Sequence, residues 1–283
     1  MTATEYSFFA GLRTFDQERS IHMNMTNGTI LITGGSSGIG FELARQLVAL
    51  GNTVAITGRD TTNLEAAQAK LPRLKIFQSD VSDPKAIPAL CKRVVADLPA
   101  LNVLINCAGM MRKIDLQKAS LNMEDVTREI ETNLNGTIWM DLQFLPHLKR
   151  QANAAIVNVS SGLAFVPMPI SPVYSASKAA VHAFTLSLRM QLKNTRVKVF
   201  ELAPPATDTP LFWGDFTQED VGSLKPMSVQ MLAKRAIAGM KKDVLEIRPG
   251  LANALQLGSR IAPKFMLSRI GKSVDLMHAQ SNE

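Results

Sequence analysis

The chain has 283 residues, of which 46% are hydrophobic and 19% are charged, with a formal net charge of +7. This composition is typical of a folded globular protein and excludes an intrinsically disordered chain. No apolar run reaches the roughly 18 to 20 residues that a membrane-spanning helix needs, so we do not expect the chain to be an integral membrane protein.

The two cysteines, Cys91 and Cys107, and the four histidines lack the spacing of a metal or redox site, so we expect neither a metal nor a disulfide framework. Basic residues are scattered among acidic ones, without the aromatic-flanked basic clusters of nucleic-acid-binding proteins. A dinucleotide phosphate is a sufficient anionic partner, and we expect no nucleic acid. The first residues carry acidic side chains and no sustained apolar stretch, which favours a cytoplasmic protein without a secretory signal.

Three regions are predicted along the chain. Residues 1–27 form an N-terminal extension without an evident role, in which Met23 and Met25 are also plausible start sites. Residues 28–249 are predicted to form one dinucleotide-binding catalytic domain. Residues 250–283 mix apolar residues with lysine and arginine, and are predicted to be a basic, amphipathic C-terminal extension.

Six short β-rich runs alternate with segments long enough for helices. Nearly continuous apolar strands of this kind indicate a parallel sheet covered by helices on both faces, which is a doubly wound α/β fold. The predicted strands are 29–33, 53–57, 74–79, 101–106, 154–160 and 196–202.

A glycine-rich turn, "TGGSSGIG" at 33–40, joins the first strand to a helix predicted over 39–50. Glycines in this position permit a tight turn and let the backbone approach a pyrophosphate, while the helix N-terminus offers unpaired N–H groups. We therefore predict that this loop binds the cofactor; a turn that uses glycine only for steric reasons is the alternative. The predicted contacts are Gly34, Ser36, Ser37, Gly38, Ile39 and Gly40.

The second strand ends in Gly58 followed by Arg59. An acidic residue at this strand tip would accept a hydrogen bond from a free ribose 2′-hydroxyl, whereas a neutral tip followed by arginine suits a 2′-phosphate. The sequence therefore favours NADP(H), with NAD(H) still possible. Asp60 beside Arg59 weakens the argument, and a solvated arginine is the alternative.

Tyr174 and Lys178 are spaced four residues apart, so on a helix they lie on the same face. The pKa of a free tyrosine is about 10, and an adjacent ammonium favours the phenolate, which would make the pair useful for proton transfer. The alternative is an ordinary contact between two side chains spaced i, i+4 on the surface of a helix.

Several short motifs occur together in the order and spacing of the short-chain dehydrogenase/reductase family. Over residues 28 to about 247 the chain resembles that family, and within it the DltE-like oxidoreductases. The motifs are "TGGSSGIG" (33–40), "DV" (80–81), "NCAG" (106–109), "ETNLNG" (131–136), "VNVSSG" (157–162) and "YSASK" (174–178).

The resemblance implies a Rossmann-type domain and an NAD(P)-dependent oxidoreductase that acts on a carbonyl or alcohol. It implies that Tyr174 is the general acid/base, that Lys178 contacts the nicotinamide ribose and lowers the pKa of the phenol, and that Asn133 anchors a proton-relay water. Ser161 would hydrogen-bond the substrate carbonyl oxygen, with Ser160 as the alternative serine.

Further cofactor contacts are implied by the same resemblance. Asp80 and Val81 would meet the adenine, and Asn106, Ala108 and Gly109 would shape the floor of the cofactor site. Asn106 could alternatively serve only to tie backbone segments together. Nicotinamide contacts would come from Pro204, Thr207 and Thr209, although "PPATDT" at 204–209 departs from the usual family motif.

The segment 211–227 breaks the strand–helix rhythm and carries Phe212, Trp213 and Phe216. A variable loop with aromatic residues suggests a lid over an apolar or bulky small-molecule substrate, and Phe165 could line the same pocket. These aromatics could instead pack against the protein itself. Helices around 127–150 and 174–193 are apolar on more than one face, which suggests a homodimer or homotetramer.

Two other functions remain open from the sequence. A cofactor-binding sensor or scaffold would use the same fold with little turnover. A membrane-peripheral enzyme would use the basic segment after Gly250, although we expect that segment to cover the pocket or a subunit interface and expect no membrane association.

Overall fold

A seven-stranded parallel sheet forms the centre of the computed structural model, which describes residues 22–118 and 120–281. The order β3-β2-β1-β4-β5-β6-β7 confirms the predicted doubly wound fold. Six strands lie within two residues of their predicted bounds, whereas β7 is too short for an apolar pattern to reveal. The strands are β1 Thr29–Thr33, β2 Thr53–Gly58, β3 Lys75–Gln78, β4 Val103–Asn106, β5 Ala154–Val159, β6 Val197–Leu202 and β7 Glu246–Ile247.

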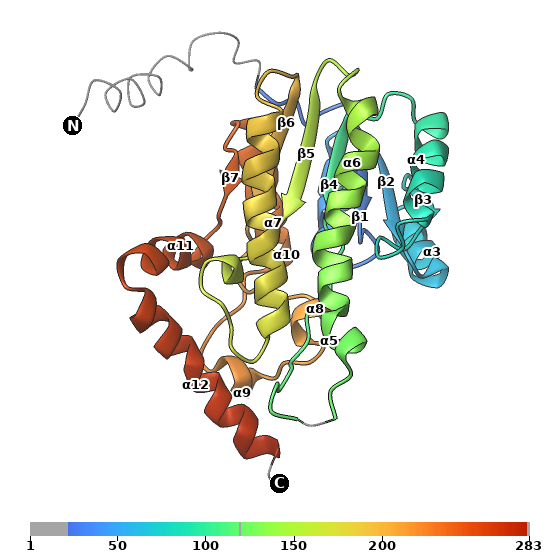
Figure 1. Cartoon of the computed structure of the whole chain (residues 1–283). Coiled ribbons are helices and arrows are strands. Elements are labelled where there is room, and N and C mark those ends of the chain that lie inside the picture. The colour runs from blue at the N-terminus through green and yellow to red at the C-terminus, as the bar shows by residue number, and fades with distance from the viewer. Residues whose placement is uncertain (1–21, 119, 282–283) are drawn as a thin grey trace, which may run out of the picture.

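Helices cover both faces of this sheet (Figure 1). They are α2 Gly38–Ala49, α3 Thr61–Lys70, α4 Ala86–Asp97, α5 Met123–Ile130, the π-helix η1 Glu131–Asn135, α6 Gly136–Leu148, the 3₁₀-helix η2 Gly162–Ala164, α7 Pro172–Gln191, α8 Pro210–Trp213, α9 Gln218–Val221, α10 Val229–Lys241, α11 Leu251–Ile261 and α12 Pro263–Ser281. None of the helices in the described part of the chain combines the length and apolarity needed to cross a bilayer.

The alternation of side chains along the strands divides the core into two layers. Ile30 and Ile32 pack with α2, α3 and α10, whereas Leu31 between them packs with α4, α6 and α7. All three side chains are fully buried, and each such burial contributes roughly 1.5–3 kcal/mol. Parallel strands with both faces covered have few polar residues, which is why the apolar runs were readable in the sequence.

The order in which the chain adds strands to the sheet reverses between β1 and β4. β1 pairs with β2 on one side and with β4 on the other, and the later strands continue outward from β4. Chain connections therefore leave these two strand tips toward opposite sides, and ligands of such folds bind in the crevice that opens between them. The predicted cofactor loop follows β1 at this position.

Residues 22–27 pack onto the core of the sheet. Met23 and Met25 are only 2% and 1% exposed and pack in the core layer of α2 and α10. The Met25 carbonyl oxygen accepts from Asn52 Nδ2 at 2.9 Å, and the Met23 N–H donates to Asp243 at 3.1 Å. The extension predicted over 1–27 thus includes core residues at its end, while positions 1–21 lie outside the described residues.

The C-terminal segment forms two helices that contact the domain. Figure 1 shows α12 running past the end of α7, and α11 packs against η2 while α12 packs against α9. Ala252 on α11 and Ser273 and Met277 on α12 are buried. Residues 250–281 therefore continue the domain at the carboxyl end of the sheet.

We predict that Met25→Ala lowers the free energy of unfolding by about 2–5 kcal/mol, because it leaves a cavity in the core. Met123→Ala is the matched control, since Met123 is 87% exposed and its loss should change stability by about 0.5 kcal/mol or less. Urea unfolding of both variants measures the difference. Equal effects would contradict the assignment of residues 22–27 to the core.

Candidate active site

A cavity of about 590 Å³ runs along the carboxyl ends of the strands and brings together most of the predicted site residues. Among the predicted catalytic and cofactor-binding residues, Asn106 and Asn133 are the two that do not line it. Those that do are Gly34, Ser36, Ser37, Gly38, Ile39, Gly40, Arg59, Asp80, Val81, Ala108, Gly109, Ser161, Tyr174, Lys178, Pro204, Thr207 and Thr209.

The glycine-rich loop has a shape that side chains would prevent. Gly34 has a φ of +63°, and a Cβ there would lie 2.8 Å from the Cα of Ala108. A Cβ on Gly40 would lie 2.4 Å from the carbonyl oxygen of Gly34. The backbone N-terminal to α2 is extended at Ser37, and no side chain caps the helix. These features fit a phosphate group, which would accept from the uncapped N–H groups.

Thr33 joins the two strand tips at the floor of the crevice. Its Oγ1 accepts from the backbone N–H groups of Cys107 and Ala108, both at 3.0 Å. The side chain is 1% exposed, so these hydrogen bonds form away from water. Thr33 thereby fixes the loop after β4 against the loop after β1.

Arg59 lies at the tip of β2, on the cavity wall. The neighbouring Asp60 is engaged as the N-cap of α3, where its carboxylate accepts from the Asn63 N–H at 3.0 Å. The acidic residue that weakened the sequence argument therefore has a structural role in capping a helix. Asp80 is also fixed, because its Oδ1 accepts from both the N–H and the hydroxyl of Ser82.

Tyr174 and Lys178 lie on one face of α7, which begins with proline, a residue favoured in the first helical turn. Lys178 Nζ lies 5.8 Å from the centroid of the Tyr174 ring and donates to the Val159 carbonyl oxygen at 2.8 Å. Both side chains are buried on the cavity wall. The pair is therefore part of the cavity and not a surface contact.

Burial dominates the electrostatics of this pair. It raises the pKa of Tyr174 to about 12, while the interaction with the Ser161 side chain acts in the opposite direction. Burial also lowers the pKa of Lys178 to about 8. The net shift of the Tyr174 pKa is upward because desolvation of the phenolate outweighs the favourable contacts, and the predicted lowering of this pKa by Lys178 stays a prediction.

Ser161 and Ser160 have different surroundings, although both line the cavity. The Ser160 hydroxyl donates to the carboxylate of Glu201, which is itself buried and bonded to His182. Ser161 interacts with Tyr174 and accepts from the Leu163 N–H. This arrangement favours Ser161 over Ser160 as the serine that would meet a substrate.

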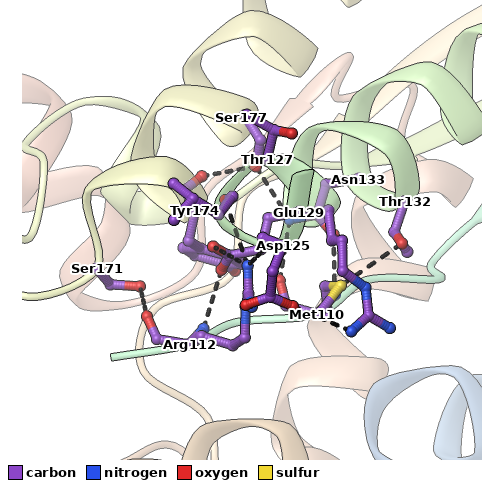
Figure 2. A network of polar contacts seen from close by, with 12 residues as sticks. Met110, Arg112, Asp125, Thr127, Glu129, Thr132, Asn133, Ser171, Tyr174 and Ser177 are labelled. Carbon is purple, nitrogen blue, oxygen red and sulfur yellow. Dashed lines mark hydrogen bonds and ion pairs between the residues drawn. The ribbon is translucent and has the colours of Figure 1, made fainter. Parts of the chain in front are cut away.

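Asn133 lies behind the cavity in the π-helix η1 and is fully buried. Its amide accepts from the Met110 N–H at 2.8 Å and donates to the Met110 carbonyl oxygen at 3.0 Å and to Ser177 at 3.0 Å. Ser177 in turn donates to the carbonyl oxygen of Tyr174 (Figure 2). Asn133 thus holds the loop after β4 against α7, and its predicted contact with a relay water stays a prediction.

A second clamp on the same loop was not anticipated from the sequence. The Arg112 N–H donates to the buried carboxylate of Glu129 at 2.9 Å, and the Arg112 carbonyl oxygen accepts from Ser171 at 2.8 Å. Figure 2 shows these residues around Tyr174. Because Ser171 directly precedes α7, the clamp helps to set the position of the helix that carries Tyr174.

Asn106 does not form the floor of the cavity, which corrects the prediction. Its side chain donates to Asp141 at 2.6 Å and to Asn158 at 2.9 Å, within a buried polar cluster between β4, β5 and α6. Asn158 also donates to Asp141, at 2.9 Å. The alternative interpretation, in which Asn106 ties segments of the protein together, agrees with these contacts.

The aromatic residues of the predicted lid differ in their contacts. Phe212 lines the cavity, whereas Trp213 and Phe216 pack against Phe212 at centroid distances of 4.8 and 6.3 Å. Phe165 does not line the cavity, because its ring packs edge-on against His182. The expectation for Phe165 is therefore wrong, and one of the three lid aromatics reaches the cavity.

Four residues of the C-terminal helices complete the cavity: Leu251, Leu255, Arg269 and Ile270. The sequence identified this segment only as a basic, amphipathic extension. Helical spacing predicts that Leu251 and Leu255 share one face, but it does not reveal the surface against which that face packs.

Comparison with known proteins agrees with this geometry. Residues 28–220 match the family model described as short chain dehydrogenase. The chain belongs to the short-chain dehydrogenase family. It is similar to the uncharacterized oxidoreductase DltE of Bacillus subtilis, with 48% identity over 189 residues that cover 67% of this chain and 75% of that protein.

Solved structures of this family have the same fold. A short-chain dehydrogenase from Burkholderia cenocepacia in complex with NADP has a TM-score of 0.76 and 25% identity, covering 88% of this chain and 99% of that one. A 3-ketoacyl-(acyl-carrier-protein) reductase from Brucella melitensis complexed with NADH has a TM-score of 0.70 and 25% identity, covering 77% and 91%. Family membership and these structures identify the chain as an NAD(P)-dependent oxidoreductase.

The buried cluster around Asp141 yields a prediction on pH. Burial raises the pKa of Asp141 to about 7, although the amides of Asn158 and Asn106 act in the opposite direction. The folded protein therefore retains a proton that the unfolded chain loses near pH 4, so stability contributed by this group is lost as the pH rises from about 4 to about 7.

Compared with Asp141→Asn, the wild-type protein should lose up to about 1.4 kcal/mol of unfolding free energy per pH unit across this window. Urea unfolding at several pH values measures the difference, with the exposed Asp97→Asn as the matched control. A difference between wild type and Asp141→Asn that does not change with pH would contradict the prediction.

Proposed function

We propose that this protein transfers a hydride between NADP(H) and the carbonyl or alcohol carbon of an apolar small molecule, with Tyr174 as the general acid/base. The observation that carries the proposal is the position of Tyr174, Lys178 and Ser161 on one wall of the cavity that also holds the glycine-rich loop. A binding loop and a proton donor in one cavity are the two parts that such a reaction requires.

The cofactor, when bound, supplies or accepts the hydride. In the reductive direction the carbonyl oxygen gains negative charge as the hydride arrives at carbon, and it needs hydrogen-bond donors at that point. Ser161 and Tyr174 would donate to this oxygen, and the Tyr174 proton would pass to it to give the alcohol. A phenol whose pKa is about 12 holds its proton at neutral pH and can still protonate an alkoxide, which is a stronger base.

Lys178 would hold the nicotinamide ribose in this arrangement. Its ammonium already donates to the Val159 carbonyl oxygen, which fixes the side chain beside Tyr174 and leaves further N–H groups for a ribose hydroxyl. Asn133 would act behind it as a positioning residue. A Cβ on Gly109 would lie 3.2 Å from Asn133 Oδ1 and 3.7 Å from Lys178 Nζ, so the two side chains converge on this glycine.

The preference for NADP(H) is supported by the tip of β2. Gly58 and Arg59 line the cavity there, while the Asp60 carboxylate is engaged at the N-terminus of α3. A guanidinium is suited to a 2′-phosphate, and the residue at the end of the strand is a glycine where NAD-binding folds carry an acidic side chain for the 2′-hydroxyl. NAD(H) remains the weaker alternative, and the Burkholderia cenocepacia relative was solved with NADP.

An apolar substrate is supported by the apolar side chains among the cavity lining. They include Met111, Leu163, Met168, Phe212 and Leu255. A substrate there would exchange water for apolar contacts, which favours binding in proportion to the apolar area covered.

Assembly as a homodimer or homotetramer, in the cytoplasm, is also part of the proposal. The exposed Leu142 on α6 and Met190 on α7 place apolar side chains on the outer helical layer. These residues lie within the two segments for which the sequence suggested a partner surface.

A sensor or scaffold that binds the cofactor without turnover is the second candidate. The cavity would serve it equally well, but a pure binding protein has no need of a buried phenol beside a lysine and a serine. Hydride transfer to a panel of carbonyl compounds separates the two candidates.

We expect Tyr174→Phe to reduce kcat for carbonyl reduction with NADPH by roughly a hundred- to ten-thousandfold, because the substituted ring cannot donate a proton. NADPH binding, measured by fluorescence titration, should change little, since the ring remains in place. An active Tyr174→Phe enzyme would remove Tyr174 from the reaction. Cofactor binding without turnover of any compound by the wild-type protein would favour the sensor.

We expect Arg59→Glu to weaken NADPH binding by at least tenfold and to leave NADH binding nearly unchanged, because a carboxylate repels the 2′-phosphate. Arg73→Glu is the matched control, since Arg73 is exposed and does not line the cavity. Titration of both cofactors into both variants gives the comparison. An unchanged affinity of Arg59→Glu for NADPH would place the 2′-phosphate elsewhere.

A further inference from the structure

One charged side chain faces the substrate half of the cavity without a role in the proposed reaction. The charged residues that line the cavity are Arg59, Asp60, Asp80, Lys178 and Arg269. The first three come from the tips of β2 and β3, and Lys178 lies beside Tyr174. Arg269 comes from α12 and is the one charged residue that the C-terminal helices contribute.

The fold places Arg269 and Arg59 on opposite sides of Tyr174. β2 and β3 form one edge of the sheet, while α11 and α12 follow β7 at the other edge. Figure 1 shows α12 beyond the end of α7, away from β2 and β3. A cofactor that extends from the β2 tip toward Tyr174 would therefore not reach Arg269, and a substrate on the far side would.

The surroundings of Arg269 are apolar. Ile270 next to it packs in one cluster with Val221 on α9 and with Leu163 and Met168 before α7, and Leu255 on α11 also lines the cavity. Within the described part of the chain Arg269 makes no hydrogen bond or ion pair. Two acidic residues of the neighbouring segments have other partners: Asp115 pairs with His278, and Asp220 pairs with Lys113. An exposed guanidinium beside an apolar wall can donate two hydrogen bonds to an anion without losing an existing partner.

We propose that Arg269 recognises an anionic group, such as a carboxylate, at the end of an apolar substrate chain whose carbonyl lies at Tyr174. The substrate class is thus an amphipathic carbonyl compound, with the chain against the apolar wall and the anion at α12. This inference rests on the proposed function for the carbonyl end, but the recognition of the anion can be measured without turnover.

The first measurement is binding. Octanoate and methyl octanoate serve as probes of equal chain length that differ in charge, titrated into the protein saturated with NADP. We expect octanoate to bind more tightly than the ester, and Arg269→Gln to weaken octanoate binding by roughly three- to tenfold while leaving ester binding unchanged. High salt should weaken octanoate binding alone, because the site is exposed to solvent.

The second measurement is turnover of ω-oxo-octanoate and its methyl ester with NADPH. Arg269→Gln should raise KM for the acid and leave kcat nearly unchanged, since the anion is bound equally in the ground state and the transition state. Lys272→Gln is the matched control, because Lys272 is an exposed cation one turn further along α12 that does not line the cavity. It should behave as wild type with both compounds.

The outcomes separate the two proposals. If both compounds are turned over and Arg269→Gln has the same KM for the acid as the wild type, the role of Arg269 is overturned and the proposed function stays intact. Octanoate binding that depends on Arg269, without turnover of either aldehyde, supports the anion site and counts against hydride transfer. Octanoate binding that is equal in wild type, Arg269→Gln and Lys272→Gln overturns the anion site directly.

Discussion

The close approach of the backbone after β1 to the backbone after β4 is the constraint on which the site depends. At Gly34 there is no room for a Cβ against Ala108. Next to this contact, Thr33 Oγ1 accepts hydrogen bonds from two backbone N–H groups of the loop after β4. Because β1 and β4 lead their connections in opposite directions, the crevice above this junction opens to solvent. The glycine-rich loop and the wall carrying Tyr174 therefore keep a fixed relation to each other.

Burial dominates the electrostatics of Tyr174 and Lys178. The phenol of Tyr174 is shielded from water, so its neutral form is favoured, and the same shielding brings the pKa of Lys178 down to about 8. A neutral phenol that donates to Ser161 or to a substrate oxygen is consistent with this environment. Lys178 donates one hydrogen bond to the Val159 carbonyl oxygen, which holds α7 to the end of β5.

Much of the fold was readable from the sequence because the strands are buried on both faces and appear as unbroken apolar runs. The two residues of β7 form no such run. Motif spacing located Tyr174, Lys178 and Ser161, but it could not show that Asn106 contacts Asp141, a residue 35 positions later on a different element. The packing of Phe165 on His182 likewise depends on how η2 meets α7, and local patterns do not encode that contact.

The two halves of the cavity differ in the groups that line them, and this difference bears on substrate specificity. Backbone groups and strand tips form the cofactor half, where a Cβ at Gly34 or Gly40 would collide with the neighbouring loop. Side chains from α8, α9, α11 and α12 line the other half together with Met111, Leu163 and Met168, and these four helices lie outside the sheet. Exchange of such side chains alters the shape and charge presented to the substrate and leaves the β1–β4 junction intact. The C-terminal helices are therefore the part of the fold best placed to determine which small molecule enters the cavity.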